Sequence, residues 1–293
     1  MSLNCLRKLS TAFFLVAISL NGYGQVWKPV GNGLPQFVNS FYNYESVVNG
    51  NELVVAFCAN DPFIDQFYIG ISTWNGITWN NFPMLMDSSG VYPYSDVELA
   101  VFQGDYYLNA MSGLDTASAL FRFDGTKWDT ISPPGLAKWA ITSLKVIGAK
   151  LYVGGYFEAS GGIKSIMSFD GTSFSALPPI PAVLGITDIA EANGNLYILG
   201  TNYYSATIPF DSCFFVLDTI TNSWQSATNN FPQVFFAPTK LLSHSGKIYM
   251  YSPFGGNSPF VFNNNAISEI PSMKMTAQDA CIYNGQFTML GTD

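Results

Sequence analysis

Charged and metal-binding side chains are scarce in this sequence. Charged residues make up 11% of the 293 residues, against roughly 25% in an average protein. There is one histidine, His244, and beyond the first 24 residues there is one arginine, Arg122. A copper or zinc site of the usual kind needs several nitrogen or thiolate ligands, and a substrate-binding arginine cluster needs more than one arginine. The sequence therefore predicts no such metal site and no cofactor.

The first 24 residues have the pattern of a cleaved signal peptide. Arg7 and Lys8 precede an apolar run at 11–20, and small residues follow it. The run is too short to span a bilayer, and no later stretch reaches about 18 uninterrupted apolar residues. We expect a signal peptide at 1–24, a mature domain at 25–293, a secreted or cell-surface location, and no membrane span.

The expected mature chain is acidic. Of the 12 basic residues, 10 remain after the signal peptide, against 20 acidic residues, so the net charge is near −10. Nucleic acid and anionic membranes are disfavoured as partners of such a surface. The three remaining cysteines, Cys58, Cys213 and Cys281, form a poor disulfide framework because their number is odd. Each lies in an apolar stretch, and we expect small buried thiols.

One unit recurs along the chain. It consists of an apolar strand, a glycine turn, a second apolar strand, a variable loop, a third strand, an Asn-Gly or Asp-Gly turn, and a short strand that begins with an aromatic residue. The first turns contain Gly50, Gly104, Gly148, Gly194, Gly246 and Gly285, spaced by a mean of 47 residues. The aromatic residues are Trp79, Trp128, Phe174 and Trp224, with Trp27 before the first unit.

This unit predicts an all-β fold. Two-residue hairpin turns need positive φ, which Asn-Gly and Asp-Gly supply at low cost. A four-stranded sheet with two apolar faces cannot bury both alone, whereas sheets stacked around an axis can. We therefore predict a β-propeller of about six four-stranded blades. The sixth unit has two strands before Asp293, so we expect residues 25–31 to close the last blade; the alternative is a C-terminally truncated chain.

Residues 151–179, LYVGGYFEASGGIKSIMSFDGTSFSALPP, resemble a kelch-type unit. The resemblance rests on the Gly154-Gly155 pair, the Asp-Gly turn and the aromatic-led last strand, and on a spacing close to the kelch repeat of about 50 residues. The chain is also similar to tandem propeller repeats of large secreted bacterial surface proteins. The resemblance implies a galactose-oxidase-like propeller without its catalytic residues, and kelch families share a fold rather than a function.

The strand order places the long loops on one rim of the propeller, and loops on a rigid scaffold usually carry function. Its candidate binding residues are Phe63, Phe67, Tyr92, Tyr94, Trp139, Tyr203, Tyr204, Phe235 and Phe236. Such rings stack on sugars or anchor protein partners; alternatively they cover the core or plug the central channel. Asp61 and Asp65 offer oxygen ligands for Ca²⁺, but solvated loop ends are the favoured interpretation. The favoured function is a secreted, non-enzymatic module that binds a protein or a glycan.

An enzymatic alternative remains, because a glycosidase needs only two suitably placed carboxylates. The candidates from first strands and crossovers are Glu45, Asp96, Glu98, Asp188, Glu191 and Asp279. Repeat symmetry predicts that Glu45, Asp96, Asp188 and Asp279 occupy equivalent positions. The simpler interpretation is that these residues cap strand ends around a wet channel. A third alternative is a structural segment of a larger surface protein.

Overall fold

The computed structural model describes 12 segments of the chain, which carry all the structural statements below. They are residues 40–61, 66–86, 97–111, 118–131, 141–159, 163–180, 185–201, 214–227, 239–252, 259–270, 276–283 and 286–292. These segments form strands and turns. None of the described residues belongs to a helix that is long and apolar enough to cross a membrane. The prediction of an all-β fold is confirmed.

The first three sheets each contain four consecutive antiparallel strands. The first has β1 (Ser40–Asn49), β2 (Glu52–Asp61), β3 (Gln66–Trp74) and β4 (Trp79–Asn81), with β5 (Leu85–Met86) also paired to β3. The second has β6 (Leu99–Phe102), β7 (Asp105–Met111), β8 (Ser118–Phe123) and β9 (Trp128–Thr130). The third has β10 (Ile141–Ile147), β11 (Lys150–Ala159), β12 (Ile163–Phe169) and β13 (Phe174–Ala176).

The remaining three sheets continue the repeat. The fourth has β14 (Gly185–Ala192), β15 (Asn195–Thr201), β16 (Phe214–Asp218) and β17 (Ser223–Ser226). The fifth has β18 (Lys240–His244), β19 (Lys247–Tyr251), β20 (Phe260–Asn263) and β21 (Ala266–Glu269). In the sixth, the described residues give two strands, β22 (Thr276–Tyr283) and β23 (Gln286–Thr292). The strand expected from residues 25–31, with Trp27, lies outside the described segments.

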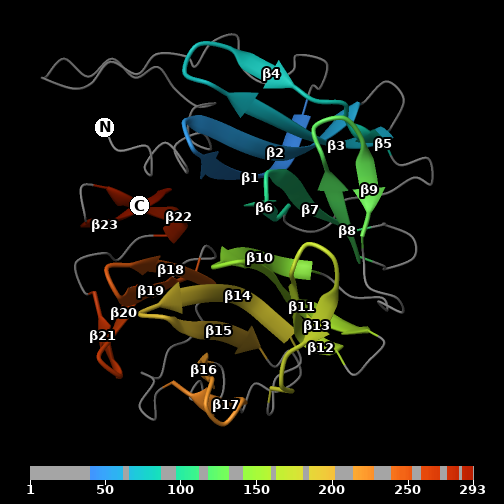
Figure 1. Ribbon diagram of the computed structural model, residues 1–293. Helices are drawn as coiled ribbons and strands as arrows, with labels where there is room; N and C mark the ends of the chain where they lie inside the picture. The colour runs from blue at the N-terminus through green and yellow to red at the C-terminus, as the bar shows by residue number, and fades with distance from the viewer. Residues whose placement is uncertain are drawn as a thin grey trace, which may run out of the picture.

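The six sheets follow one another in chain order around a common centre, and the first strand of each lies nearest to it (Figure 1). Consecutive first strands are neighbours: β1 contacts β6, β6 contacts β10, β10 contacts β14, β14 contacts β18, and β18 contacts β22. This is a β-propeller, as predicted, and each sheet is one blade. The central position of the first strands decides where a functional site can be built.

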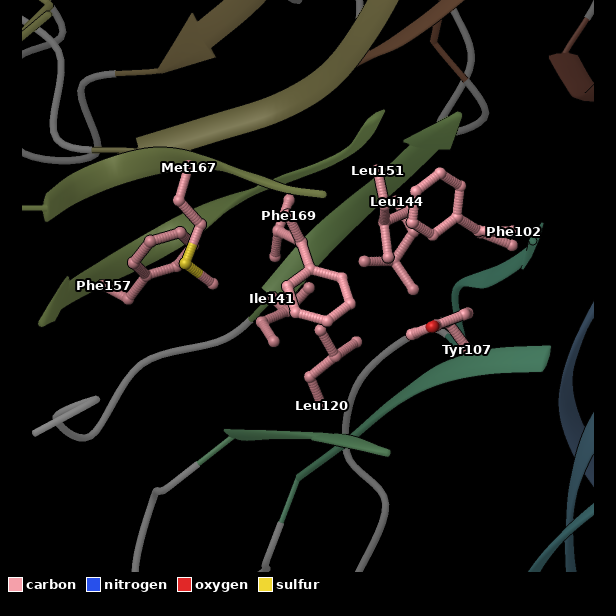
Figure 2. Close-up of a cluster of buried hydrophobic side chains, with 11 residues drawn as sticks. Phe102, Tyr107, Leu120, Ile141, Leu144, Leu151, Phe157, Met167 and Phe169 are labelled. Carbon is pink, nitrogen blue, oxygen red and sulfur yellow. The ribbon is translucent and has the colours of Figure 1, made fainter. Parts of the chain in front are cut away.

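Apolar side chains of adjacent blades pack against each other and hold the propeller together. Five such cores join the six blades in series. Figure 2 shows the core between the second and third blades, where Phe102 and Tyr107 face Leu151 and Phe169. Phe102 and Phe169 meet edge to face, with ring centroids 6.4 Å apart. Each blade therefore buries on its neighbours the apolar faces that it cannot bury alone.

The aromatic residue that begins the fourth strand packs between its own blade and the preceding one. Trp128 lies against the core of the first and second blades, and Trp224 belongs to that of the third and fourth. Both indoles also donate a hydrogen bond to the preceding blade. The Nε1 of Trp128 lies 2.8 Å from the carbonyl oxygen of Pro83, and the Nε1 of Trp224 lies 2.8 Å from that of Pro178. These two indoles therefore fill the space between neighbouring blades.

The short turns lie on one face of the propeller, as the strand order predicts. Gln103, in the β6–β7 turn, donates from Nε2 to the carbonyl oxygen of Asp170 in the β12–β13 turn, at 3.0 Å. Asn193, in the β14–β15 turn, donates from Nδ2 to the carbonyl oxygen of Gly246 in the β18–β19 turn, at 3.1 Å. The turn residues adopt positive φ, for example 78° at Gly194. These hydrogen bonds connect neighbouring blades at this face.

Candidate functional site at the centre of the propeller

One position of the innermost strands carries a polar residue in every blade. In each first strand it lies four residues before the last paired residue, and in the five fully registered hairpins it pairs with equivalent positions of the second strand. We call these six residues the central ring. They are Glu45, Glu98, Ser143, Asp188, Lys240 and Asp279.

The ring corrects one predicted equivalence. The sequence suggested that Asp96 is the second-blade counterpart of Glu45 and Asp188, but the register assigns Glu98. The backbone N–H of Asn109 donates to the backbone carbonyl oxygen of Glu98, with 3.4 Å between nitrogen and oxygen. This bond places Glu98 directly before the paired residues of β6 and β7. Asp96 is two residues further from the hairpin and lies outside the described segments. Counting from the hairpin turn, which is fixed by positive φ, identifies the correct residue, whereas the start of the strand does not.

An ion pair crosses the centre of the ring. The Nζ of Lys240, from the fifth blade, lies 3.0 Å from Oε1 of Glu98, from the second blade. In a ring of six blades these two lie opposite each other, so the lysine reaches across the axis instead of pairing with an adjacent blade. The side chain of Glu98 is 10% exposed and that of Lys240 is 28% exposed. The cation is therefore the more accessible partner.

Glu98 is held in a buried and polar environment. Its backbone N–H donates to Oδ1 of Asn109 at 2.7 Å, and Nδ2 of Asn109 donates to the carbonyl oxygen of Ile141 in the third blade at 2.6 Å. Burial raises the pKa of Glu98 from 4.5 to about 7, and the nearby carboxylates of Glu45 and Asp188 add to the rise, while Lys240 opposes it. A carboxyl group with this pKa exchanges its proton near neutral pH, which is the property of a general acid.

Lys240 keeps its positive charge. The carboxylate of Glu98 raises the pKa of Lys240 well above its usual range, with further contributions from Asp188 and Glu45, and desolvation opposes the rise. The described part of the ring thus holds one cation among three acidic residues. Two acidic residues remain without a matching positive charge when all of them are ionised.

Asp188 is saturated with hydrogen bonds from three blades. Its Oδ1 accepts the hydroxyl of Ser143 at 2.9 Å and the amide of Ile189 at 2.8 Å, and its Oδ2 accepts the amide of Leu241 at 2.7 Å. Because these donors belong to the third, fourth and fifth blades, the carboxylate fixes the spacing of three inner strands. Its role is therefore to position the ring, while Glu45 is the half-buried carboxylate of the first blade.

Two other predicted carboxylates, Glu191 and Asp279, have no described side chain in the central ring. Glu191 accepts the amide of Gly194 at 2.7 Å in the β14–β15 turn, so it stabilises a hairpin instead of facing the centre. Asp279 occupies its ring position in the backbone of β22, opposite Leu290, but its side chain lies outside the described part. Sequence reasoning missed Ser143 and Lys240, although their distance from the turn would have identified both; no sequence signal marks Asn109.

The predicted rim remains a prediction. The described segments exclude Phe63, Asp65, Tyr92, Tyr94, Trp139, Tyr203, Tyr204, Cys213, Phe235 and Phe236. Phe67 pairs with Asn60 in the backbone of β3 and β2, but its side chain is outside the description, as are those of Asp61, Cys58 and Cys281. Within the described residues, no group of three or more His, Cys, Asp or Glu side chains is placed to hold a metal ion.

No protein-family model and no curated protein matches this chain. Among solved structures, the chain is similar to a GH93 α-L-arabinofuranosidase of Fusarium graminearum, with 11% identity, a TM-score of 0.47, and 79% and 80% of the two chains covered. It is similar to a GH43 β-xylosidase/α-arabinofuranosidase from a compost metagenome, with 10% identity, a TM-score of 0.42, and 81% and 96% covered. It is also similar to an exo-β-1,3-galactanase from Phanerochaete chrysosporium, with 11% identity, a TM-score of 0.37, and 75% of this chain and 61% of the galactanase covered.

The central ring corrects the favoured function, which was a non-enzymatic module that acts through the rim. The similar solved structures just described are glycoside hydrolases. At such low identity they concern the fold alone. The ring itself favours the hydrolase alternative, because it brings buried Glu98 close to two further acidic residues at the centre of the propeller. The simpler interpretation was that these residues cap strand ends around a wet channel. Asp188 does accept backbone amides of two inner strands, but Glu98 and Asp188 are both buried, with 8% of each residue exposed.

Proposed function

We propose that the protein is a carbohydrate-active hydrolase that cleaves glycosidic bonds at the central ring. In this proposal Glu98 is the general acid and Glu45 is the second carboxylate. The observation that carries the proposal is the burial of Glu98, which raises its pKa to about 7, beside Glu45 and Asp188. Hydrolysis of a glycosidic bond needs one protonated and one ionised carboxyl group, and the burial of Glu98 favours the protonated form of that residue.

The two roles follow from the surroundings of the two carboxyl groups. Glu98 lies in a buried environment that favours its neutral form, so it can donate a proton to the leaving oxygen. Glu45 is half-buried on β1, in the blade next to that of Glu98. An accessible carboxylate serves as the nucleophile or as the base that activates water. Asp188 holds the inner strands in place through its three hydrogen bonds.

We infer three further properties from the sequence. Residues 1–24 direct export, the domain at 25–293 acts outside the cytoplasm or at the cell surface, and its repeats are of the kelch type. An exported hydrolase with an acidic surface has glycans outside the cell as its accessible substrates. Detection of a mature chain that begins at Gln25 would support this part of the proposal, and retention of the first 24 residues would contradict it.

A glycan screen with matched variants tests the proposed function. Wild-type protein is incubated with a panel of polysaccharides and aryl glycosides, and released reducing sugar or aglycone is measured. Glu98→Gln and Glu45→Gln should each lower kcat by about 10²-fold or more. Glu158→Gln is the control, since Glu158 forms an exposed ion pair with Lys164 on β11 and β12, at 3.0 Å. Failure of the wild type on every substrate, or equal losses in all three variants, would refute the proposal.

A further inference from the structure

The central ring contains a single cation among its described side chains, and that cation is more exposed than its partner. Lys240 spans the axis to Glu98, yet 28% of its side-chain surface remains accessible, against 10% for Glu98. The ammonium group is therefore the member of this pair that is more accessible to a ligand at the ring. Glu45, Asp188 and Glu98 all contribute to the negative field around this ammonium group.

We propose that Lys240 binds the carboxylate of an acidic sugar, of the uronic acid type, and that this exchange of partners releases Glu98 to act as the acid. The inference rests on the proposed hydrolase function and specifies its substrate class. A neutral sugar offers no anion to replace Glu98, so the pair between Lys240 and Glu98 stays closed and Lys240 continues to oppose protonation of the acid. An acidic sugar is thus selected by the step that also prepares the catalyst.

The balance of charge supports this exchange. With all groups ionised, Glu45, Glu98 and Asp188 carry three negative charges and Lys240 one positive charge, a total of −2. When a sugar carboxylate takes Lys240 and Glu98 takes up a proton, the total is again −2. The buried ring therefore accepts a singly charged anion at no change in net charge, provided that one proton enters with it. A phosphorylated sugar brings a second charge that one lysine does not neutralise.

The groups that face Glu98 decide whether it takes up this proton. Glu45 on β1 and Asp188 on β14 favour its neutral form, and Lys240 on β18 alone favours its ionised form. Ser143 on β10 does not titrate and donates to Asp188. Asp279 on β22 has the same register position. Loss of Lys240 to another anion consequently removes the interaction with Lys240 that lowers the pKa of Glu98.

The bonds and protons balance in the resulting reaction. The bond between the anomeric carbon and the leaving oxygen breaks, and the leaving oxygen receives the proton from Glu98. Water supplies a hydroxyl group to the anomeric carbon, either directly or through a Glu45 ester, and its other proton returns to a carboxylate of the ring. No oxidant, reductant or metal takes part, and Lys240 remains protonated throughout as a positioning residue.

Pairs of substrates that differ only at C6 test the inference. Polygalacturonate is compared with a galactan of the same linkage, and aryl glucuronides with the corresponding aryl glucosides. The wild type should have a kcat/KM at least roughly tenfold higher for the acidic member. Lys240→Gln should abolish or invert this preference, and Lys240→Arg should retain it because the cation remains. Lys164→Gln, at an exposed ion pair, is the control. Circular dichroism and a thermal melt verify that each variant folds.

The outcomes separate this inference from the proposed function. Equal or faster hydrolysis of neutral substrates, lost in Glu98→Gln, would overturn the acidic-sugar inference and leave the hydrolase proposal standing. If neither class of substrate is hydrolysed, the hydrolase proposal fails. Calorimetry with free D-galacturonate and D-glucuronate then decides the anion site: binding that requires Lys240 and takes up about one proton near pH 8 supports it, and no binding overturns it.

Discussion

The ammonium nitrogen of Lys240 lies 3.0 Å from Oε1 of Glu98, and this contact joins two opposite blades of the propeller through its centre. The other described contacts between blades run between neighbours, as in the five apolar cores. A cross-axis ion pair therefore couples the electrostatics of the ring to the assembly of the blades. Because a buried charge is costly without its partner, changes in the protonation of Glu98 should be visible in stability as well as in activity.

The stability of the fold should depend on pH through Glu98. The pKa of Glu98 is about 7 in the folded protein, against the ordinary value of 4.5 that applies to the unfolded chain. Between these two pH values the folded protein therefore holds a proton that the unfolded chain lacks. The stabilisation from Glu98 is fully present below about pH 4.5 and is lost as the pH rises through 7, with a slope of up to about 1.4 kcal/mol per pH unit. Urea denaturation from pH 4 to 8 should show that the difference in unfolding free energy between wild type and Glu98→Gln changes in this window. A constant difference would contradict the raised pKa.

Asp188→Asn should destabilise the fold more than Ser143→Ala. The asparagine has one acceptor oxygen in place of two, so the amide of Leu241 or the donors at Oδ1 lose their acceptor. Loss of a charge-assisted, buried hydrogen bond costs about 2–3 kcal/mol, whereas loss of the serine hydroxyl costs about 1 kcal/mol. Chemical denaturation of both variants measures the difference. Equal losses would show that the carboxylate does not clamp the inner strands.

The two indole hydrogen bonds between blades should contribute different amounts to the free energy of unfolding, because they differ in burial. Trp224 is 6% exposed, whereas the bond from Trp128 lies at the surface. Trp224→Phe should lower the unfolding free energy by about 1–2 kcal/mol, because the carbonyl of Pro178 loses its donor in a partly buried site. Trp128→Phe should cost less than about 1 kcal/mol, since water replaces the indole. Phenylalanine fits this position, as Phe174 shows in the third blade. A larger loss for Trp128 would be inconsistent with this account.

Gly154 should tolerate no side chain, although its φ is ordinary. A methyl group there would lie 2.8 Å from Cγ2 of Ile186 and 3.0 Å from Cδ1 of Ile189, both in the next blade. Gly154→Ala should therefore cost about 1–3 kcal/mol through overpacking. Gly50→Asn is the control, because Gly50 has φ of 58° and no atom near its added carbon, and asparagine tolerates this conformation. Thermal melts of both variants test the comparison. A melting temperature of Gly154→Ala equal to that of the wild type would contradict the close packing of these blades.

The blades themselves were predictable from local chemistry. Positive φ is needed where two residues close a hairpin, so glycines such as Gly104 and Gly194 mark the turns and hence the strands on either side. The same turns locate the central ring by counting back along the strand, which selects Glu98 in place of Asp96. Gly154, the first glycine of the kelch-type pair, has a physical basis in the close approach of Ile186.

The chemistry of the ring was less predictable, because it depends on how distant blades face one another. Nothing local to Lys240 indicates that its side chain crosses the axis to a residue 142 positions away. The three donors to Asp188 come from three blades, and Asn109 gains its role only because the third blade presents the carbonyl of Ile141. Burial of a carboxyl group, and the pKa that follows from it, is a property of the assembled propeller.

The central claim is that Glu98 donates a proton to the leaving group, and the most direct test varies that group. Wild type and Glu98→Gln are compared on two glycosides of the hydrolysed sugar, one with a poor alkyl leaving group and one with dinitrophenolate, which departs without protonation. We predict a loss of about 10²-fold or more on the alkyl glycoside and a small loss on the dinitrophenyl glycoside. Equal losses on both substrates would contradict the assignment of Glu98 as the acid.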